Sequence, residues 1–423
     1  MINRLKSFAH QGTLRFNNQM KKALVCLIGL VSLSAGVCAQ KTDRFMGEIV
    51  NYDEGAVPAY TLPDILLTTK GKKIKTVSAW KKQRRPELLA LFEEHVYGKT
   101  PDSFDSVKFM VTNENAVAMA GKAHLKEVTI TAWNHGHSVS FPVVLFIPNK
   151  RTKPAPAFLL INNRNSRNTD PARVEKSTFW PAEMVIDNGY AIAAFHHSDV
   201  APDRKDSYQN GVLKQLFPEV LEKDNGMKAI GVWAWAASRV MDYFKTDKDI
   251  DFNKVALVGH SRGGKTSLWS AAQDQRFAMV FSSCSGSTGA SLARRKYGET
   301  ISLINKQFGY WFNNNYKKYS NDVNSLPVDQ HMLIGLIAPR PVYTTNATED
   351  RWADPYGSFL SLRNAKAVYD LYGEKVALPK NMPGVNMPII HSAIGYHFRE
   401  GKHDLNVYDW TNFIRFANHH FNL

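Results

Sequence analysis

A serine between two glycines is the residue of this chain best placed to do chemistry. Ser261 lies in a G-x-S-x-G motif over residues 259–263, after an apolar run that ends at Val258 and before an Ala-rich segment that extends to Gln273. The apolar run predicts a buried strand and the Ala-rich segment predicts a helix. The two glycines suit a turn too tight for side chains beside a strained serine. The segment therefore predicts a nucleophile elbow, the alternative being a purely structural strand-turn-helix with solvated cations.

Two cations follow this serine within the predicted first turn of the helix. Arg262 and Lys265 stand where the helix dipole disfavours positive charge by about 0.3–1 kcal/mol each. A negative charge that develops at Ser261 during reaction would compensate that cost. Lys265 lies four residues after Ser261, which places both side chains on one helix face. The pattern favours acyl transfer with an anionic tetrahedral intermediate.

A serine nucleophile needs a base, and the base needs an acid that orients it. In hydrolases with this elbow the chain order is serine, acid, histidine. The loop after the predicted strand 341–345 offers Asp350 as the acid, with Glu349 as the alternative. His403 precedes the last predicted helix and is the expected base. His391 and His397 fall within a predicted strand over 389–398, where a packed histidine is the better interpretation.

The elements that must position these residues alternate between strands and helices. Three strand-like runs over 107–147 predict an antiparallel start, and short apolar runs at 157–162 and 190–195 predict central parallel strands. The expected fold is a three-layer αβα sandwich with a mostly parallel central sheet. We expect a leader over 1–39 and an N-terminal segment over 40–105 whose helix packs on the core. The catalytic domain is expected over 106–423, with a helical insertion at about 288–333.

Composition and charge narrow the class of protein. The chain has 423 residues, 44% hydrophobic and 22% charged, as in a soluble globular protein. Of the net charge of +15, five positive charges lie before residue 40, which leaves +10. The chain has no block of Lys and Arg with interleaved aromatic residues, so we do not predict nucleic-acid binding. A basic surface suits an acidic polysaccharide.

The first residues indicate export. Residues 20–39 have a basic start, an apolar core too short to span a membrane, and small residues at the end, which predicts a secretory signal and a periplasmic or secreted protein. Removal of the leader leaves Cys284 as the last cysteine, so no intramolecular disulfide is expected. We find no metal-ligand spacing and no phosphate loop, and expect neither metal nor cofactor.

At this point the chain resembles a known family, the bacterial branch of the glucuronoyl esterases (carbohydrate esterase family 15) within the α/β-hydrolases. The matching pieces are the elbow at 259–265, residues 298–301 and 310–313, the loop 350–355, and 401–403 with 409–410. The resemblance implies hydrolysis of the ester between (4-O-methyl-)glucuronic acid on xylan and lignin alcohols, through an acyl-enzyme. It also implies that Arg262 holds the oxyanion and that Lys265, Glu299 and Trp352 bind the sugar.

One position departs from the family pattern. Many members carry the triad acid as a glutamate just after the strand that follows the elbow, and Cys284 stands there in this chain. A neutral cysteine cannot stabilise an imidazolium as a carboxylate does, which favours Asp350 as the acid. Two alternatives stay open: another plant-polysaccharide carboxylesterase such as an acetylxylan esterase, or a catalytically impaired carbohydrate-binding protein on a hydrolase fold.

Overall fold

A large mixed sheet runs through the middle of the protein, and the residues expected to form the site follow the ends of its strands. The computed structural model describes residues 43–45 and 47–423. Within them the sheet has nine strands in the order β11-β10-β9-β8-β6-β7-β5-β4-β3. The strands from β7 to β11 along this order pair in parallel, and β5, β4 and β3 continue antiparallel at one edge. Their bounds are β3 Ser106–Ala118, β4 Ala123–Asn134, β5 His137–Pro148, β6 Ala155–Asn162, β7 Ala191–His196, β8 Ile250–His260, β9 Met279–Ser283, β10 Val342–Ala347 and β11 Ile394–Arg399.

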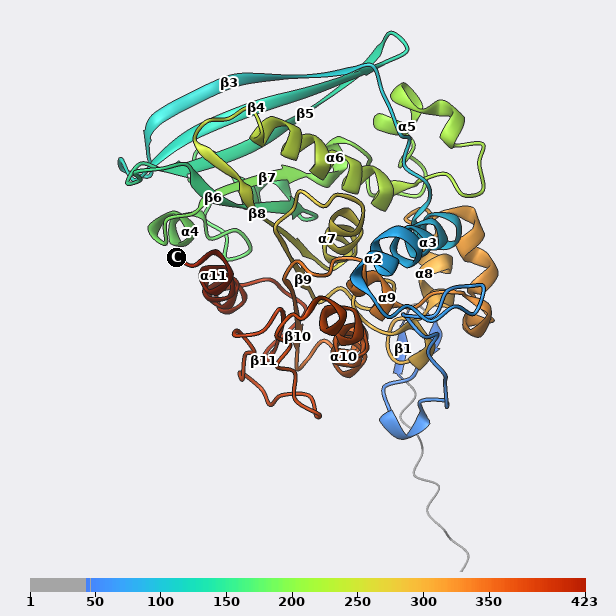
Figure 1. Ribbon diagram of the computed structural model, residues 1–423. Coiled ribbons are helices and arrows are strands. Elements are labelled where there is room, and N and C mark those ends of the chain that lie inside the picture. Colours follow the sequence, from blue (N-terminus) through green and yellow to red (C-terminus); the bar gives the residue numbers. More distant parts are fainter. Residues whose placement is uncertain (1–42, 46) are drawn as a thin grey trace, which may run out of the picture. The chain divides into compact units, whose positions relative to one another are not determined.

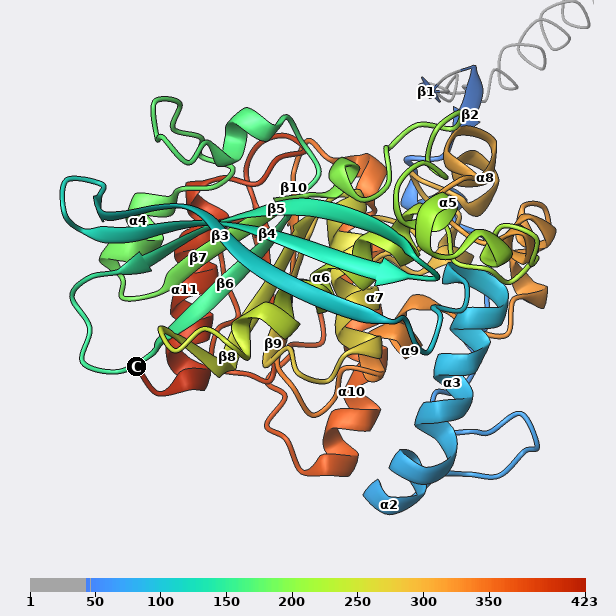
Figure 2. The ribbon, with the colours of Figure 1, turned by 90° about the horizontal axis from the view of Figure 1, so that it is seen from above.

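Helices cover both faces of this sheet, as Figures 1 and 2 show. One face packs against α6, α7, α9 and α10, and the other against α4 and α11. The helices are α4 Ala182–Asp187, α5 Val212–Leu216, α6 Ala229–Phe244, α7 Arg262–Gln273, α8 Ile301–Phe308, α9 Gln330–Gly335, α10 Pro355–Tyr372 and α11 Val407–Phe421. The predicted three-layer α/β fold is confirmed.

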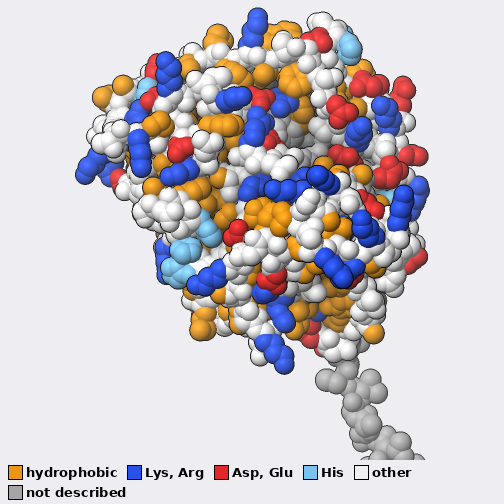
Figure 3. All heavy atoms as spheres, viewed as in Figure 1, with side chains coloured by type: hydrophobic (Ala, Val, Ile, Leu, Met, Phe, Trp, Pro, Cys, Tyr) orange, Lys and Arg blue, Asp and Glu red, His pale blue; other side chains and the backbone are white. Residues whose placement is uncertain are grey.

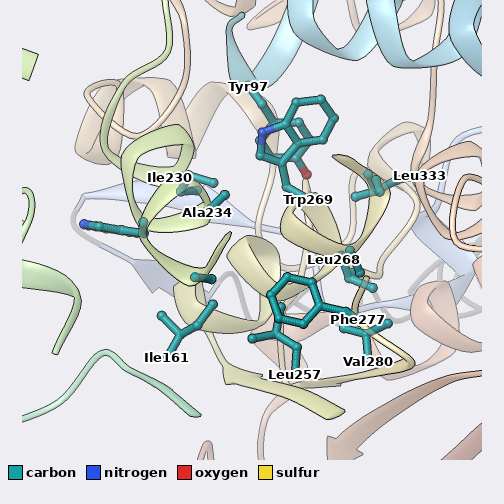
Figure 4. Close-up of a cluster of buried hydrophobic side chains, with 14 of the residues drawn as sticks. Tyr97, Ile161, Ile230, Ala234, Leu257, Leu268, Trp269, Phe277, Val280 and Leu333 are labelled. Atoms are coloured by element: carbon teal, nitrogen blue, oxygen red, sulfur yellow. The ribbon is translucent and has the colours of Figure 1, made fainter. Parts of the chain in front are cut away.

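Apolar burial explains why the central strands lie where they do. Every residue of β6 is buried, as expected for a parallel strand covered on both faces. Around α7 the core contains a stacked pair, Tyr97 and Trp269, with ring centroids 4.6 Å apart (Figure 4). Leu268 and Phe277 extend this cluster toward Leu257 of β8. These aromatic side chains thus fix the position of α7, the helix that follows Ser261.

A helical run precedes the sheet in sequence and packs against α7 and α9. It comprises α2 Val77–Ala79, a π-helical segment Trp80–Arg84, α3 Arg85–Phe92 and a second π-helical segment Glu93–Tyr97. Trp80, Leu88 and Phe92 are fully buried in the same core as α7. Residues 45–423 form one compact unit, whereas the expected leader over 1–39 lies outside the described residues. Two short strands begin the described chain, β1 Asp43–Phe45 and β2 Glu48–Val50.

The predicted last strand over 389–398 was too long at its start. β11 begins at Ile394, and Ile389 folds back onto it, donating its N–H to Tyr396 O at 2.8 Å. His391 is consequently exposed, contrary to the packed role expected for it, whereas His397 is buried as expected.

Charge on the surface is mixed. Lys and Arg side chains alternate with Asp and Glu over the face seen in Figure 3, and histidines gather over α11. Among the described residues no helix combines the length and the apolar character that crossing a membrane requires.

Candidate active site

The predicted elbow is present at the end of β8. Ser261 has φ 55° and ψ −124°, a strained backbone for a residue with a side chain, and α7 begins at the next residue. A Cβ on Gly259 would lie 1.9 Å from Gly263 O, and a Cβ on Gly263 would lie 3.1 Å from Ile161 O. Gly259 is therefore required for the turn to close, and a side chain at Gly263 would be tight against the end of β6. The turn places the half-buried Ser261 at the carboxyl edge of the sheet.

His403 and Asp350 meet at the same edge. His403 Nδ1 lies 2.7 Å from Asp350 Oδ2, with the carboxylate 3% exposed and the imidazole 40% exposed. The His403 ring also packs on His260, the residue before Ser261, with 4.6 Å between centroids. Burial, followed by nearby charges, lowers the pKa of His260 well below its usual value, so His260 stays neutral. His403 and Asp350 are thus paired, and the contact with His260 places the His403 ring next to the elbow that carries Ser261.

Sheet order accounts for this convergence. The loops after β8, β9, β10 and β11 carry Ser261, Cys284, Asp350 and His403, and these four strands are consecutive in the sheet. Ligands and reacting groups of open α/β sheets meet at such carboxyl ends. Glu349, the alternative acid, is exposed on the same loop, whereas Asp350 is buried. The structure separates two carboxylates that the sequence could not.

Cys284 lies beside the acid and the base. Its Sγ, an Asp350 carboxylate oxygen and a His403 ring nitrogen all lie within 4.8 Å of one another. The residue is 1% exposed and has φ 48°. Burial, with the Asp350 charge, raises the pKa of the thiol well above its usual value. A thiol with a raised pKa is neutral, so of the two residues beside His403 only Asp350 can offer a carboxylate to the ring.

Arg262 is held by a carboxylate, 10% exposed, that sequence reasoning missed. Its guanidinium pairs with Asp203, which also accepts hydrogen bonds from Tyr310 Oη and Trp311 Nε1, both at 2.8 Å. The guanidinium packs 5.0 Å from the Trp311 ring centroid. Burial opposes ionisation of Asp203, but His197 and Arg262 more than offset it and hold the pKa of that carboxyl well below its usual range. Arg262 keeps 32% of its side chain exposed, so the ion pair orients it without enclosing it.

The three residues expected to bind sugar form one cluster. Lys265 is 2% exposed and donates to Ser285 O at 2.8 Å, to Ser287 O and to Glu299 Oε2 at 2.6 Å. Glu299 N donates to Trp352 O at 2.9 Å, which joins the two loops. The Lys265 ammonium is therefore fully engaged by protein acceptors, contrary to the expectation that it reaches the sugar directly.

Phe45 lies against the expected sugar-binding tryptophan. The Phe45 and Trp352 ring centroids are 4.2 Å apart, with 40° between the ring planes. Phe45 itself remains 39% exposed. One side of the indole is therefore occupied by this chain's own N-terminal segment.

A second arginine that sequence reasoning did not single out holds the His403 loop. Arg164 pairs with Asp404 at 2.7 Å, approaches His403 O at 3.5 Å and packs 4.5 Å from the Phe179 ring centroid. Arg399, at the end of β11, donates to Asp404 O at 2.5 Å and pairs with the buried Asp409. The loop that carries His403 is thus fixed from both sides.

Sequence signals for these supporting residues are weak. Asp203 and Arg164 follow strands at the active edge, but each is one of several charged residues in its loop. The one available signal was the unusual pair of cations at the helix start, which requires a negative partner without indicating where it lies. Only the folded chain identifies that partner.

A strained serine after a parallel strand, an imidazole beside it and a buried carboxylate define a class of protein. That class is the carboxylic ester hydrolases of the α/β-hydrolase fold.

Comparison with known proteins gives the family. The family model for fungal glucuronyl esterases matches residues 130–373. Carbohydrate esterase MZ0003, from an unidentified prokaryote, is 38% identical over 400 residues, covering 88% of this chain and 92% of its own. The solved structure of a promiscuous esterase of carbohydrate esterase family 15, from a marine bacterial metagenome, has a TM-score of 0.81 at 37% identity, covering 88% of this chain and all of the other. A glucuronoyl esterase from Solibacter usitatus has a TM-score of 0.80 at 34% identity, covering 86% and 99%. This chain belongs to the glucuronoyl esterase family.

Proposed function

We propose that the protein hydrolyses esters of the glucuronic acid carboxyl group, with the ester between (4-O-methyl-)glucuronic acid on xylan and a lignin alcohol as its natural substrate. The observation that carries this proposal is the buried Asp350 at 2.7 Å from His403, at the same edge of the sheet as the strained Ser261. Membership of the glucuronoyl esterase family indicates that glucuronic acid is the acid component of the ester. The cation at the elbow, Arg262, agrees with an oxyanion that forms from the ester carbonyl.

In the proposed reaction His403 Nε2 accepts the Ser261 proton while Oγ attacks the ester carbonyl. Asp350 accepts from Nδ1–H and stabilises the imidazolium that forms. Collapse of the tetrahedral intermediate expels the alcohol, which takes the proton from His403, and leaves a glucuronoyl ester on Ser261. Water, deprotonated by the same histidine, then releases the acid.

Arg262 and the first-turn N–H groups of α7 would stabilise the oxygen of that intermediate. N–H groups at a helix start have no acceptor within the helix and carry partial positive charge. The ion pair with Asp203 fixes the guanidinium before substrate arrives, which is what makes such stabilisation effective.

Glu299 and Trp352 would contact the sugar ring. The Lys265 ion pair keeps Glu299 fixed as an acceptor for hydroxyl groups, and an aromatic face suits the apolar side of a sugar. Phe45 restricts access to one side of Trp352. This arrangement favours recognition of a single uronate ring.

We propose glucuronoxylan or small uronate esters as the partners, and a periplasmic or secreted location. The loop after β6 adds a polar hollow of about 370 Å³ lined by amide, basic and acidic side chains: Asn165, Arg167, Asn168, Glu175, Lys176 and Ser177. Such groups suit sugar hydroxyls and carboxylates. The expected leader supports export.

The test compares two substrates and one variant. We expect benzyl glucuronate ester to be hydrolysed and an acetylated xylo-oligosaccharide to be a poor substrate, with Ser261→Ala inactive on both. Preferred deacetylation would assign the protein to acetylxylan esterases instead. Hydrolysis that survives Ser261→Ala would rule out Ser261 as the nucleophile, and binding of the xylan fragment without hydrolysis of either ester by the unaltered chain would leave a carbohydrate-binding role as the better interpretation.

A further inference from the structure

The thiol beside the catalytic pair adds a soft sulfur donor that a glutamate in the same place would lack. Sγ of Cys284, a carboxylate oxygen of Asp350 and a ring nitrogen of His403 come from three loops and lie within 4.8 Å of one another. One sulfur, one imidazole nitrogen and one carboxylate oxygen are the donors that Zn²⁺ takes in proteins, and sites with three protein ligands keep a fourth position open. Among the described residues this is the one such group of three or more.

We propose that Cys284, His403 and Asp350 form an inhibitory binding site for Zn²⁺ and similar thiophilic divalent cations. The ion would bind His403 at Nδ1, the nitrogen that lies 2.7 Å from Asp350. His403 is 40% exposed at its side chain, which gives the ion a path to the two buried ligands. Closing the three ligands around one ion requires them to approach to about 2.0–2.3 Å from it.

Binding stops catalysis through the tautomer of His403. In the working enzyme Nδ1 carries the proton and Nε2 is free to accept the Ser261 proton. A metal at Nδ1 takes that lone pair, so the neutral imidazole holds its proton at Nε2 and cannot act as a base. The thiol proton of Cys284 is released to solvent, and no electrons are transferred. Asp350 is at the same time drawn from the imidazole to the ion.

The inhibitory step depends on the proposed Ser261–His403–Asp350 mechanism, but metal binding can be measured without it. Co²⁺ bound to a thiolate gives a charge-transfer absorption in the near ultraviolet. We expect this band when Co²⁺ is added to the full chain, and its loss in Cys284→Ser. Zn²⁺ should displace the Co²⁺ and abolish the band.

The same samples test inhibition. We expect Zn²⁺ to inhibit ester hydrolysis, EDTA to restore it, and Cys284→Ser to raise the half-inhibitory Zn²⁺ concentration at least about tenfold, each variant being compared with its own uninhibited rate. Mg²⁺, which prefers oxygen ligands, should not inhibit.

A second histidine pair provides the matched control. His391 Nδ1 and His419 Nδ1 lie 3.3 Å apart on the surface, where they too could hold Zn²⁺. His391→Ala should leave both the cobalt band and the inhibition unchanged. A cobalt band that is absent from the unaltered chain, or equally strong in Cys284→Ser, would overturn the proposal whatever the activity. A chain that shows the cobalt band but hydrolyses no uronate ester would retain the metal site and lose the proposed function.

Discussion

Asp203→Asn separates the role of the oxyanion arginine from that of the triad. Oδ1 of Asp203 accepts from Tyr310 and Trp311, and Oδ2 faces Arg262. An asparagine that keeps its oxygen toward the two aromatic donors must turn its NH₂ toward the guanidinium. A donor then faces a donor, and Arg262 loses its anchor.

The size of the effect follows from what Arg262 contributes. Loss of one oxyanion donor costs about a hundred- to thousandfold in kcat. The first-turn N–H groups remain in Asp203→Asn, and the displaced guanidinium stays nearby. We therefore expect kcat to fall about ten- to a hundredfold, or about 1.4–2.7 kcal/mol, with KM changed little because the contact forms in the transition state.

The assay is steady-state hydrolysis of benzyl glucuronate ester, with the melting temperature checking the fold. Asp206→Asn is the matched control, since Asp206 lies three residues on, is 67% exposed and pairs with Arg204 at 3.0 Å on the surface. If Asp203 acts through Arg262, the double variant with Arg262→Ala is no slower than Arg262→Ala alone. An unchanged kcat in Asp203→Asn, or a double variant with fully additive losses, would refute the reasoning.

Three further results are expected. Asp350→Asn should lower kcat about a thousand- to ten-thousandfold by removing the charge that orients His403, while the exposed Glu349→Gln leaves kcat unchanged; the reverse order would move the acid to Glu349. Arg164→Ala frees the loop that carries His403, so kcat should fall about tenfold with little change in melting temperature, and Arg164→Lys should restore part of it; equal loss in both variants would argue against the Asp404 ion pair. The pKa of Asp203 is held below its unfolded value of about 3.9, so its stabilisation is present above that pH and is lost on acidification. The melting-temperature difference between the unaltered chain and Asp203→Asn should therefore shrink as pH falls below about 4. A difference that stays constant from neutral pH to pH 3 would contradict this prediction.

Much of the fold could be predicted from periodicity alone. Apolar runs without alternation gave β6, β7 and β8, and the elbow motif fixed where β8 ends. The expected order of serine, acid and histidine was enough to find Asp350 and His403, because the carboxyl ends of neighbouring parallel strands must meet.

The remainder depends on contacts between distant segments. Nothing local in the chain distinguishes Asp203 from the neighbouring acids, since its role comes from donors more than a hundred residues away. Lys265 was expected to reach the sugar, and its burial against backbone oxygens of the loop after β9 could not be read from helical spacing. Glu349 and Asp350 are neighbours in one turn, and only the folded chain shows that Asp350 faces the protein interior while Glu349 faces solvent.

The insertion between β9 and β10 has a consequence for protein engineering. Tyr310 and Trp311 lie in that insertion, and through Asp203 they decide where the Arg262 guanidinium points. Shortening this region to obtain a smaller catalyst would remove the support of the proposed oxyanion group, while every residue of the proposed triad stayed in place. Such a trimmed protein would keep a nucleophile, a base and an acid, and still be slow.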